Sequence, residues 1–298
     1  MRRYWAIIGV CCKSLSFNGF SARLSKTPAN LAGRSRCFRG QRHVIFSTGI
    51  RRSPAESEMT ESLQGKPDPD DPIAARDFAY DLASKEFSHG GPDVDGCVTV
   101  ASNINRRLEA AVDLLKREGM PIACKAGCSW CCHLRVELLP YEAVALFRYI
   151  RTAMPKSLAD RVTERIFAKA EQIRPLTPKE HERSKVQCAF LLDGRCSVYP
   201  VRPMACAAHH SADVAVCEAA FHRPTGQDDL IPQVANLVRS REMMQAAANQ
   251  AMANRNLKRQ CIELHTALSA LLRDPSLIGK WRSGRPLVKG ATPAGDES

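Results

Sequence analysis

Hydrophobic residues recur with a helical period over much of the chain. The stripe of Ile104, Leu108 and Leu115 predicts a helix over residues 103–118, and Ser102 is its candidate N-cap. The same period recurs elsewhere, and short connections separate the segments that show it. Further helices are expected at Ala74–Phe87, Glu142–Met154, Ser157–Ile173, from Thr177 onward, at Ala212–Phe221, and twice between Leu230 and Leu272.

One segment departs from this helical pattern. Two short apolar runs flank the pair Asp193-Gly194, which favours the tight turn of a β-hairpin. Such a hairpin would bring Cys188 and Cys196 near the open ends of two paired strands, where their thiols could converge on one ion. Together the patterns predict a mainly α protein, in which a helical bundle-like domain holds a small Cys-rich metal-binding module containing one β-hairpin.

Composition divides the chain into parts. Residues 1–58 are rich in Arg and Ser and carry no acidic residue before Glu56, so we expect a disordered basic leader outside the fold. It is either a stretch before a true start at Met59, which we favour, or a transit peptide. The protein is expected to be cytoplasmic, or mitochondrial if the transit peptide is genuine. The other expected parts are a linker and helix at 59–100, the helical domain at 101–280 with its module at 120–217, and a flexible tail at 281–298.

The net charge of +12 is concentrated in that leader, which carries +9. The remaining residues carry only +3, so we expect no nucleic-acid partner. No run approaches 18 apolar residues, and no membrane span is expected. The composition still allows an unidentified protein as a partner.

Cysteines are the main candidates for chemistry. Clustered thiolates repel one another and are costly to bury unless a cation neutralises them, so the pattern favours a metal. Disulfides would need an oxidising compartment, and the sequence has no clear secretory signal. Four thiolates suit zinc or iron, including a 4Fe-4S cluster, and eight could serve two sites or one site with spare sulfurs. The candidate ligands are Cys124, Cys128, Cys131, Cys132, Cys188, Cys196, Cys206 and Cys217.

Other side chains near these cysteines have two interpretations each. His209 and His210 follow Cys206, and the sequence leaves open whether either is a ligand or a polar turn residue. Arg202 could donate to sulfur and offset the negative charge of a thiolate site, or be a surface residue of a turn.

The spacing Cys124-x3-Cys128-x2-Cys131-Cys132, followed by Tyr199-Pro-x-Arg-Pro, resembles the YkgJ-type cysteine-cluster family. The resemblance covers about residues 120–217. That family is described as a zinc- or iron-chelating domain with a CxxCxxCC signature, and this chain has three residues where the signature has two between its first cysteines. The resemblance implies chelation by all the candidate cysteines except Cys217, which we add because of its place in the sequence.

Three functions follow as hypotheses. The first is a metal-binding protein with a cysteine-ligated zinc or iron–sulfur centre and no assigned reaction. The second is an iron–sulfur and S-adenosylmethionine-dependent enzyme that modifies protein, because the Cys124–Cys131 spacing resembles a radical S-adenosylmethionine loop and similar domains occur in some flagellin lysine methylases. The third is a zinc-stabilised structural or interaction module. The sequence identifies no catalytic residue.

Overall fold

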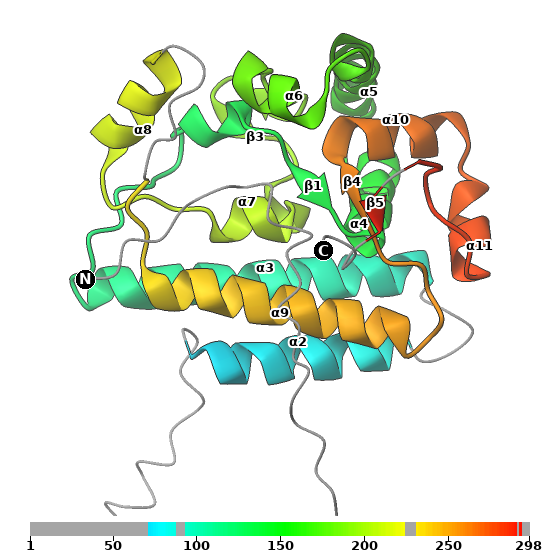
Figure 1. Cartoon of the computed structure of the whole chain (residues 1–298), viewed down its shortest axis with the longest axis horizontal. Helices are drawn as coiled ribbons and strands as arrows, with labels where there is room; N and C mark the ends of the chain where they lie inside the picture. Colours follow the sequence, from blue (N-terminus) through cyan, green and yellow to red (C-terminus); the bar gives the residue numbers. More distant parts are fainter. Residues whose placement is uncertain (1–70, 88–92, 224–230, 291, 294–298) are drawn as a thin grey trace, which may run out of the picture. The chain divides into compact units, whose positions relative to one another are not determined.

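Helices make up most of the residues that the computed structural model describes, which are 71–87, 93–223, 231–290 and 292–293. These residues contain ten α-helices, two short 3₁₀ helices and five strands of two to four residues (Figure 1). The expected mainly α fold is therefore confirmed. The expected leader at residues 1–58 lies outside the described residues.

Three long helices lie side by side (Figure 1): α2 (Pro72–Glu86), α3 (Val94–Arg117) and α9 (Ala235–Ala253). The faces of α2 and α9 that meet are rich in alanine, whose small side chains let two helix backbones approach closely. The buried alanines of these two helices are Ala75, Ala79, Ala83, Ala247, Ala248 and Ala251.

Helix α3 begins nine residues before the predicted start at residue 103. Its N-cap is Asp93, whose side chain accepts the N–H of Gly96 at 2.5 Å, so the prediction of Ser102 as the cap was wrong. A Cβ at Gly96 would lie 3.2 Å from the backbone oxygen of Glu86 at the end of α2. This glycine therefore permits a close approach between the two helices.

The remaining helices of the scaffold pack around this layer. Helix α4 contacts α3, and α5 contacts α10. The positions of α4, α5, α6 and α10 agree with the predicted segments, but helix α11 and the strand β4 between α9 and α10 were not predicted. The bounds are α4 Pro140–Thr152, α5 Lys156–Ile173, α6 Pro178–Ser184, α10 Leu264–Arg273 and α11 Leu277–Arg282.

A small antiparallel sheet joins the middle of the chain to its end. Strand β4 (Gln260–Glu263) pairs with β1 (Glu137–Leu138) on one side and with β5 (Thr292–Pro293) on the other. In the first pair Leu138 lies opposite Ile262. Both residues are buried, so this short sheet fixes the chain just before α4 and just before α10.

The elements that carry the cysteines lie between α3 and α9 in the sequence. The predicted hairpin is present, with Leu191 paired to Cys196 and both Asp193 and Gly194 at positive φ. Positive φ at both central residues is the requirement of a two-residue hairpin turn that matches strand twist. The bounds are η1 Trp130–His133, β2 Leu191–Leu192, β3 Arg195–Cys196, η2 Tyr199–Val201, α7 Met204–Ala208 and α8 Val214–His222.

The first part of the segment expected to be a flexible tail is held against β4. The side chain of Gln260 accepts the N–H of Leu287 at 2.7 Å and donates to the carbonyl oxygen of Val288 at 2.8 Å. Leu287 is fully buried, and so is Trp281 at the end of α11. Composition suggested a flexible end here. The contacts that hold it join residues distant in the sequence, so composition could not reveal them.

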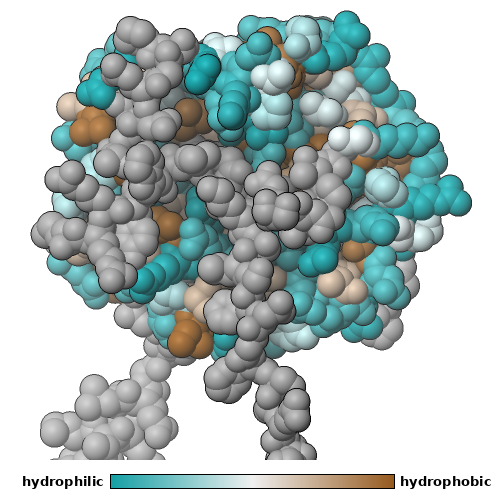
Figure 2. Space-filling model, in the orientation of Figure 1, coloured by the Kyte–Doolittle hydropathy of each residue, from teal (hydrophilic) through white to brown (hydrophobic). Residues whose placement is uncertain are grey.

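The coloured residues on the face shown in Figure 2 are mainly hydrophilic. On the face shown in Figure 2, hydrophobic residues stand singly or in small groups among hydrophilic ones. Among the described residues, no helix is both long and apolar enough to cross a membrane.

Candidate metal centre

A buried carboxylate places the helix that carries Cys206. Glu142 lies in the first turn of α4 and accepts the N–H of Leu139 at 2.8 Å through one oxygen. Its other oxygen accepts the N–H of Met204, the first residue of α7, at 2.7 Å. One side chain thus joins the starts of two helices. Burial raises the pKa of Glu142 to about 7, against the effect of these two hydrogen bonds.

Cys132, Cys188, Cys196 and Cys206 form one neighbourhood, which we call the inner thiol group. The charge of one member acts on the thiol pKa of another in every pair of the four. Burial raises the pKa of Cys188 to about 12 and that of Cys206 well above its ordinary value, and the neighbouring thiols raise both further. Negative charge in this group therefore needs a compensating cation.

Backbone N–H groups point at two of these sulfurs. Phe190 donates to Cys188, and Val198 donates to Cys196, in each case from two residues further along the chain. These hydrogen bonds favour the thiolate over the thiol and oppose the pKa increase caused by burial. A backbone hydrogen bond also joins two segments of the inner group: the N–H of Cys188 donates to the carbonyl oxygen of Cys132 at 2.8 Å.

Arg202 brings a positive charge to the same group. Its guanidinium lowers the pKa of three of the four thiols. The side chain is only 18% exposed, stacks over the ring of Tyr199 at 4.0 Å, and donates to Asn105 at 3.2 Å. Asn105 in turn donates to the carbonyl oxygen of Tyr199 at 2.7 Å, so the arginine is held in place from two sides. The structure therefore favours the interpretation of Arg202 as a residue that offsets thiolate charge over that of a surface turn residue.

Cys124, Cys128 and Cys217 form a second neighbourhood, which we call the outer thiol group. Burial raises the pKa of Cys124, and the charges of Cys128 and Cys217 raise it further. The backbone N–H of Ser211 donates to the sulfur of Cys124 at 3.2 Å. Cys217 lies on α8, which packs against η1 through Phe221. Cys217, which the family resemblance did not supply, therefore lies near another candidate, Cys124.

Cys131 lies between the two groups. Its thiol donates a hydrogen bond to Cys132, an interaction that raises the pKa of Cys131 and lowers that of Cys132. The charges of Cys206 and Cys124 also act on Cys131. One member of each thiol group is therefore near this sulfur.

The eight cysteines are gathered but not yet arranged as ligands. Within the described ranges, no group of three or more His, Cys, Asp or Glu side chains has the arrangement that could hold a metal ion. Cysteine turns about a single Cα–Cβ bond, so a change of rotamer can redirect each sulfur without moving the backbone. The donor set itself, soft sulfur supported by N–H donors and an arginine, fits zinc or iron.

Comparison with known families agrees with this donor set. Residues 123–229 match the model of the CxxCxxCC family, described as a "Putative zinc- or iron-chelating domain". These residues are therefore similar to that family. The matched residues include both thiol groups and Cys131. A search of the curated proteins found no match, and neither did a search of the solved structures.

The two histidines that follow Cys206 in the matched segment differ in their surroundings. His210 is buried, and both of its ring nitrogens bind backbone groups: Nε2 accepts the N–H of Val234 at 2.7 Å, and Nδ1 is 2.9 Å from the carbonyl oxygen of Ala208. Its ring therefore holds the loop before α9. His209 lies 3.3 Å from Gln233 through Nδ1, and burial lowers its pKa to about 3.

Sequence reasoning missed a second support for the segment that carries the inner thiols. The Nε2 atom of His265 accepts the N–H of Ala189 at 3.2 Å, so its proton lies on Nδ1, which donates to Glu263 at 2.7 Å. Ala189 directly follows Cys188, and 76 residues separate it from His265. The sequence Glu-x-His at the start of a helix does not predict such a contact, because the contact forms only when the chain folds.

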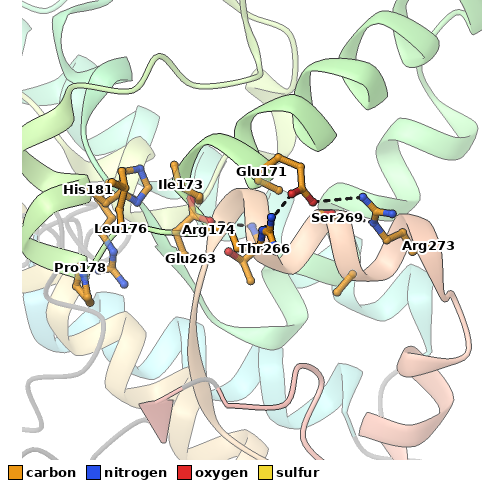
Figure 3. A pocket seen from close by; sticks show the side chains of 13 residues that line it. Glu171, Ile173, Arg174, Leu176, Pro178, His181, Glu263, Thr266, Ser269 and Arg273 are labelled. Carbon is orange, nitrogen blue, oxygen red and sulfur yellow. Dashed lines mark hydrogen bonds and ion pairs between the residues drawn. The ribbon is translucent and has the colours of Figure 1, made fainter.

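An open cavity of about 400 Å³ lies beside this support, between α5, α6 and α10 (Figure 3). Glu171 points between Arg174 and Arg273, at 3.1 Å and 3.8 Å respectively, while His181 and Glu263 line the other end. None of the eight candidate cysteines lines this cavity. Its arginines and carboxylates neutralise one another, so we assign it no ligand.

Proposed function

We propose that the CxxCxxCC domain of this protein holds a zinc or iron centre on its inner thiol group. The observation that carries the proposal is that all four thiols of this group interact with one another. The N–H donors of Phe190 and Val198 and the positive charge of Arg202 support the thiolate form that a metal requires.

The proposed centre is closed. Four thiolates fill the positions of a tetrahedral zinc site or of a 4Fe-4S cluster, whereas a catalytic zinc keeps one position for water or substrate. The ligands would come from η1, the segment that precedes β2, β3 and α7, so one ion or cluster would tie four segments together. This favours a structural or electron-transfer role for the inner site, with no reaction assigned.

Metal binding at this site is coupled to protons. Because burial holds the pKa of Cys188 and Cys206 above the ordinary thiol value, both are protonated at neutral pH without a cation. A metal must displace these protons, so its affinity rises with pH and falls in acid.

The test is elemental analysis of the full chain purified without oxygen. We expect about one equivalent of zinc, or about four iron and four sulfide with a brown colour, at the inner site. Cys196→Ser should lose this metal. Cys97→Ala, which removes a buried thiol outside both groups, should keep it. A colourless wild-type protein with well below one equivalent of either metal would contradict the proposal.

A further inference from the structure

We infer that Arg165 is a positioning residue for Cys188: its guanidinium holds residues 187–191 so that the N–H of Phe190 faces the sulfur, with or without a bound metal. The inference rests on the proposed function in taking Cys188 as a ligand of the inner centre. It gives a role to a residue of α5 that belongs to neither thiol group.

Arg165 directs its guanidinium at the oxygens of one short segment. Its Nε atom donates to the carbonyl oxygen of Ala189 at 2.9 Å. Its Nη2 atom lies 3.3 Å from the carbonyl oxygen of Cys188 and 3.2 Å from that of Leu191. The same atom donates to the side-chain oxygen of Gln187 at 3.0 Å. One side chain therefore binds three backbone carbonyl groups within four residues.

The peptide group between Ala189 and Phe190 connects this cation to the sulfur. A trans peptide group is planar, so its C=O and N–H point in opposite directions, and the described residues contain no cis peptide bond. The C=O of this group accepts from Arg165, and its N–H donates to the sulfur of Cys188. Arg165 therefore fixes one end of the peptide group whose other end supports the thiolate.

A second anchor holds the preceding peptide group from the opposite side. The N–H of Ala189 donates to Nε2 of His265 at 3.2 Å, while the carbonyl oxygen of Cys188, in the same peptide group, faces Arg165. Arg165 lies on α5 and His265 on α10, and these two helices pack against each other. Because both anchors belong to the helical scaffold, they hold the segment before any metal binds.

Burial explains why this position requires arginine. Ala189 and Phe190 are fully buried, and a buried carbonyl oxygen without a donor is costly. Arginine can serve several oxygens because its N–H groups form a rigid planar fork, whereas lysine offers a compact charge on a flexible stem. A segment already held in its binding conformation also loses less freedom when a ligand binds. We therefore expect Arg165 to increase metal affinity.

The test compares the full-length wild type with Arg165→Met and Arg165→Lys. Without metal, hydrogen exchange followed by mass spectrometry should show faster exchange at residues 188–191 in Arg165→Met, and no change in α2 or α3. After removal of bound metal and loading with Co²⁺, this variant should bind the ion about 10–100-fold more weakly. Its sulfur-to-cobalt absorption should move to longer wavelength, because a thiolate without its N–H donor gives up electrons more easily. Arg165→Lys should lie between Arg165→Met and the wild type.

Arg161→Met is the matched control. It removes an exposed arginine from the same helix, one turn earlier, and should behave as the wild type in all three measurements. Far-ultraviolet circular dichroism verifies that the helices of each variant are formed. If Arg165→Met does not fold, Arg165→Lys is measured in its place, with the same directions of change.

Each other outcome decides against the inference in a different way. Unchanged exchange at residues 188–191 shows that Arg165 does not hold this segment. Lower stability with the cobalt affinity and absorption of the wild type shows that Arg165 serves the fold alone. A wild type that binds no metal refutes the proposed function and with it the role of Cys188, whereas the exchange measurement still decides whether Arg165 fixes the segment.

Discussion

Glu142 shows how a single side chain can position a cysteine that it does not contact. Both of its oxygens accept backbone N–H groups, one at the start of α4 and one at the start of α7, which carries Cys206. Arg202 likewise has two partners: stacking on Tyr199 and a hydrogen bond to Asn105 hold its positive charge beside the thiols. At this scale the proposed metal centre depends on buried polar residues with two partners each.

The raised pKa of Glu142 predicts an unusual dependence of stability on pH. Between its ordinary value of 4.5 and its folded value of about 7, the unfolded chain has lost the proton that the folded protein keeps. The contribution of Glu142 to the free energy of unfolding therefore falls as pH rises through this range, and is constant above it.

Glu142→Gln should remove that contribution. It should also cost about 1–3 kcal/mol, because the amide NH₂ would face one of the two N–H donors. Urea unfolding at several pH values between 4.5 and 7 measures the difference between variant and wild type, which should shrink as pH rises. Glu118→Gln, at an exposed position, is the control. A difference independent of pH would show that Glu142 does not titrate in this range.

The hairpin β2–β3 is the element that brings two of the inner thiols, Cys188 and Cys196, together. Its strands have only two residues each, so the conformation of the hairpin depends largely on the turn at Asp193 and Gly194. Both turn residues have positive φ, at 49° and 72°. No other heavy atom lies within 4 Å of a Cβ built on Gly194, so substitution there tests backbone conformation without a steric clash.

Gly194→Ala should lower the free energy of unfolding by about 1–2 kcal/mol, because a side chain disfavours the left-handed conformation. It should also weaken metal binding, since Cys196 follows two residues later. Gly279 in α11 is the matched control: it also has open space at its Cβ but no positive φ, and alanine there should add about 0.5–1 kcal/mol. Thermal unfolding and zinc titration of both variants measure this, and equal effects would contradict the role of the turn.

The described molecule combines a helical scaffold with a cysteine-rich region. The long helices α2, α3 and α9 are held by apolar contacts, and their core needs no metal. The segments that carry the inner thiols are short and irregular, and few residues of regular structure stabilise them. The metal should therefore stabilise the second part more than the first.

Zinc should raise the thermal stability of the full chain. At a free concentration 100 times its Kd, binding to the folded state adds about 2.7 kcal/mol to the free energy of unfolding. Calorimetry with zinc and with a chelator measures the shift in Tm, and circular dichroism should show that most helix remains after chelation. Magnesium, which prefers oxygen ligands, is the control. A Tm unchanged by zinc would mean that no metal is coupled to folding.

Much of the architecture was predictable from local signals. The helical stripe containing Leu108 and the pair Asp193-Gly194 each depend on neighbours in the sequence, and both predictions are confirmed. The predicted start of α3 was nine residues too late, and Gly96 in its first turn serves a close contact with Glu86 that lies outside the helix. Strand β4 was missed because its partners lie far away in the sequence.

The sequence by itself determined the chemistry of the candidate site: eight cysteines in 94 residues, too concentrated for ordinary core packing, and an arginine in the turn between them. Only the tertiary structure decided how they divide. Cys131 and Cys132 are neighbours in the chain, yet Cys132 joins the inner thiols while Cys131 stands between both groups. Cys124 meets Ser211 across 87 residues. Spacing records which thiols are present, but their grouping depends on long-range hydrogen bonds and packing that no local pattern encodes.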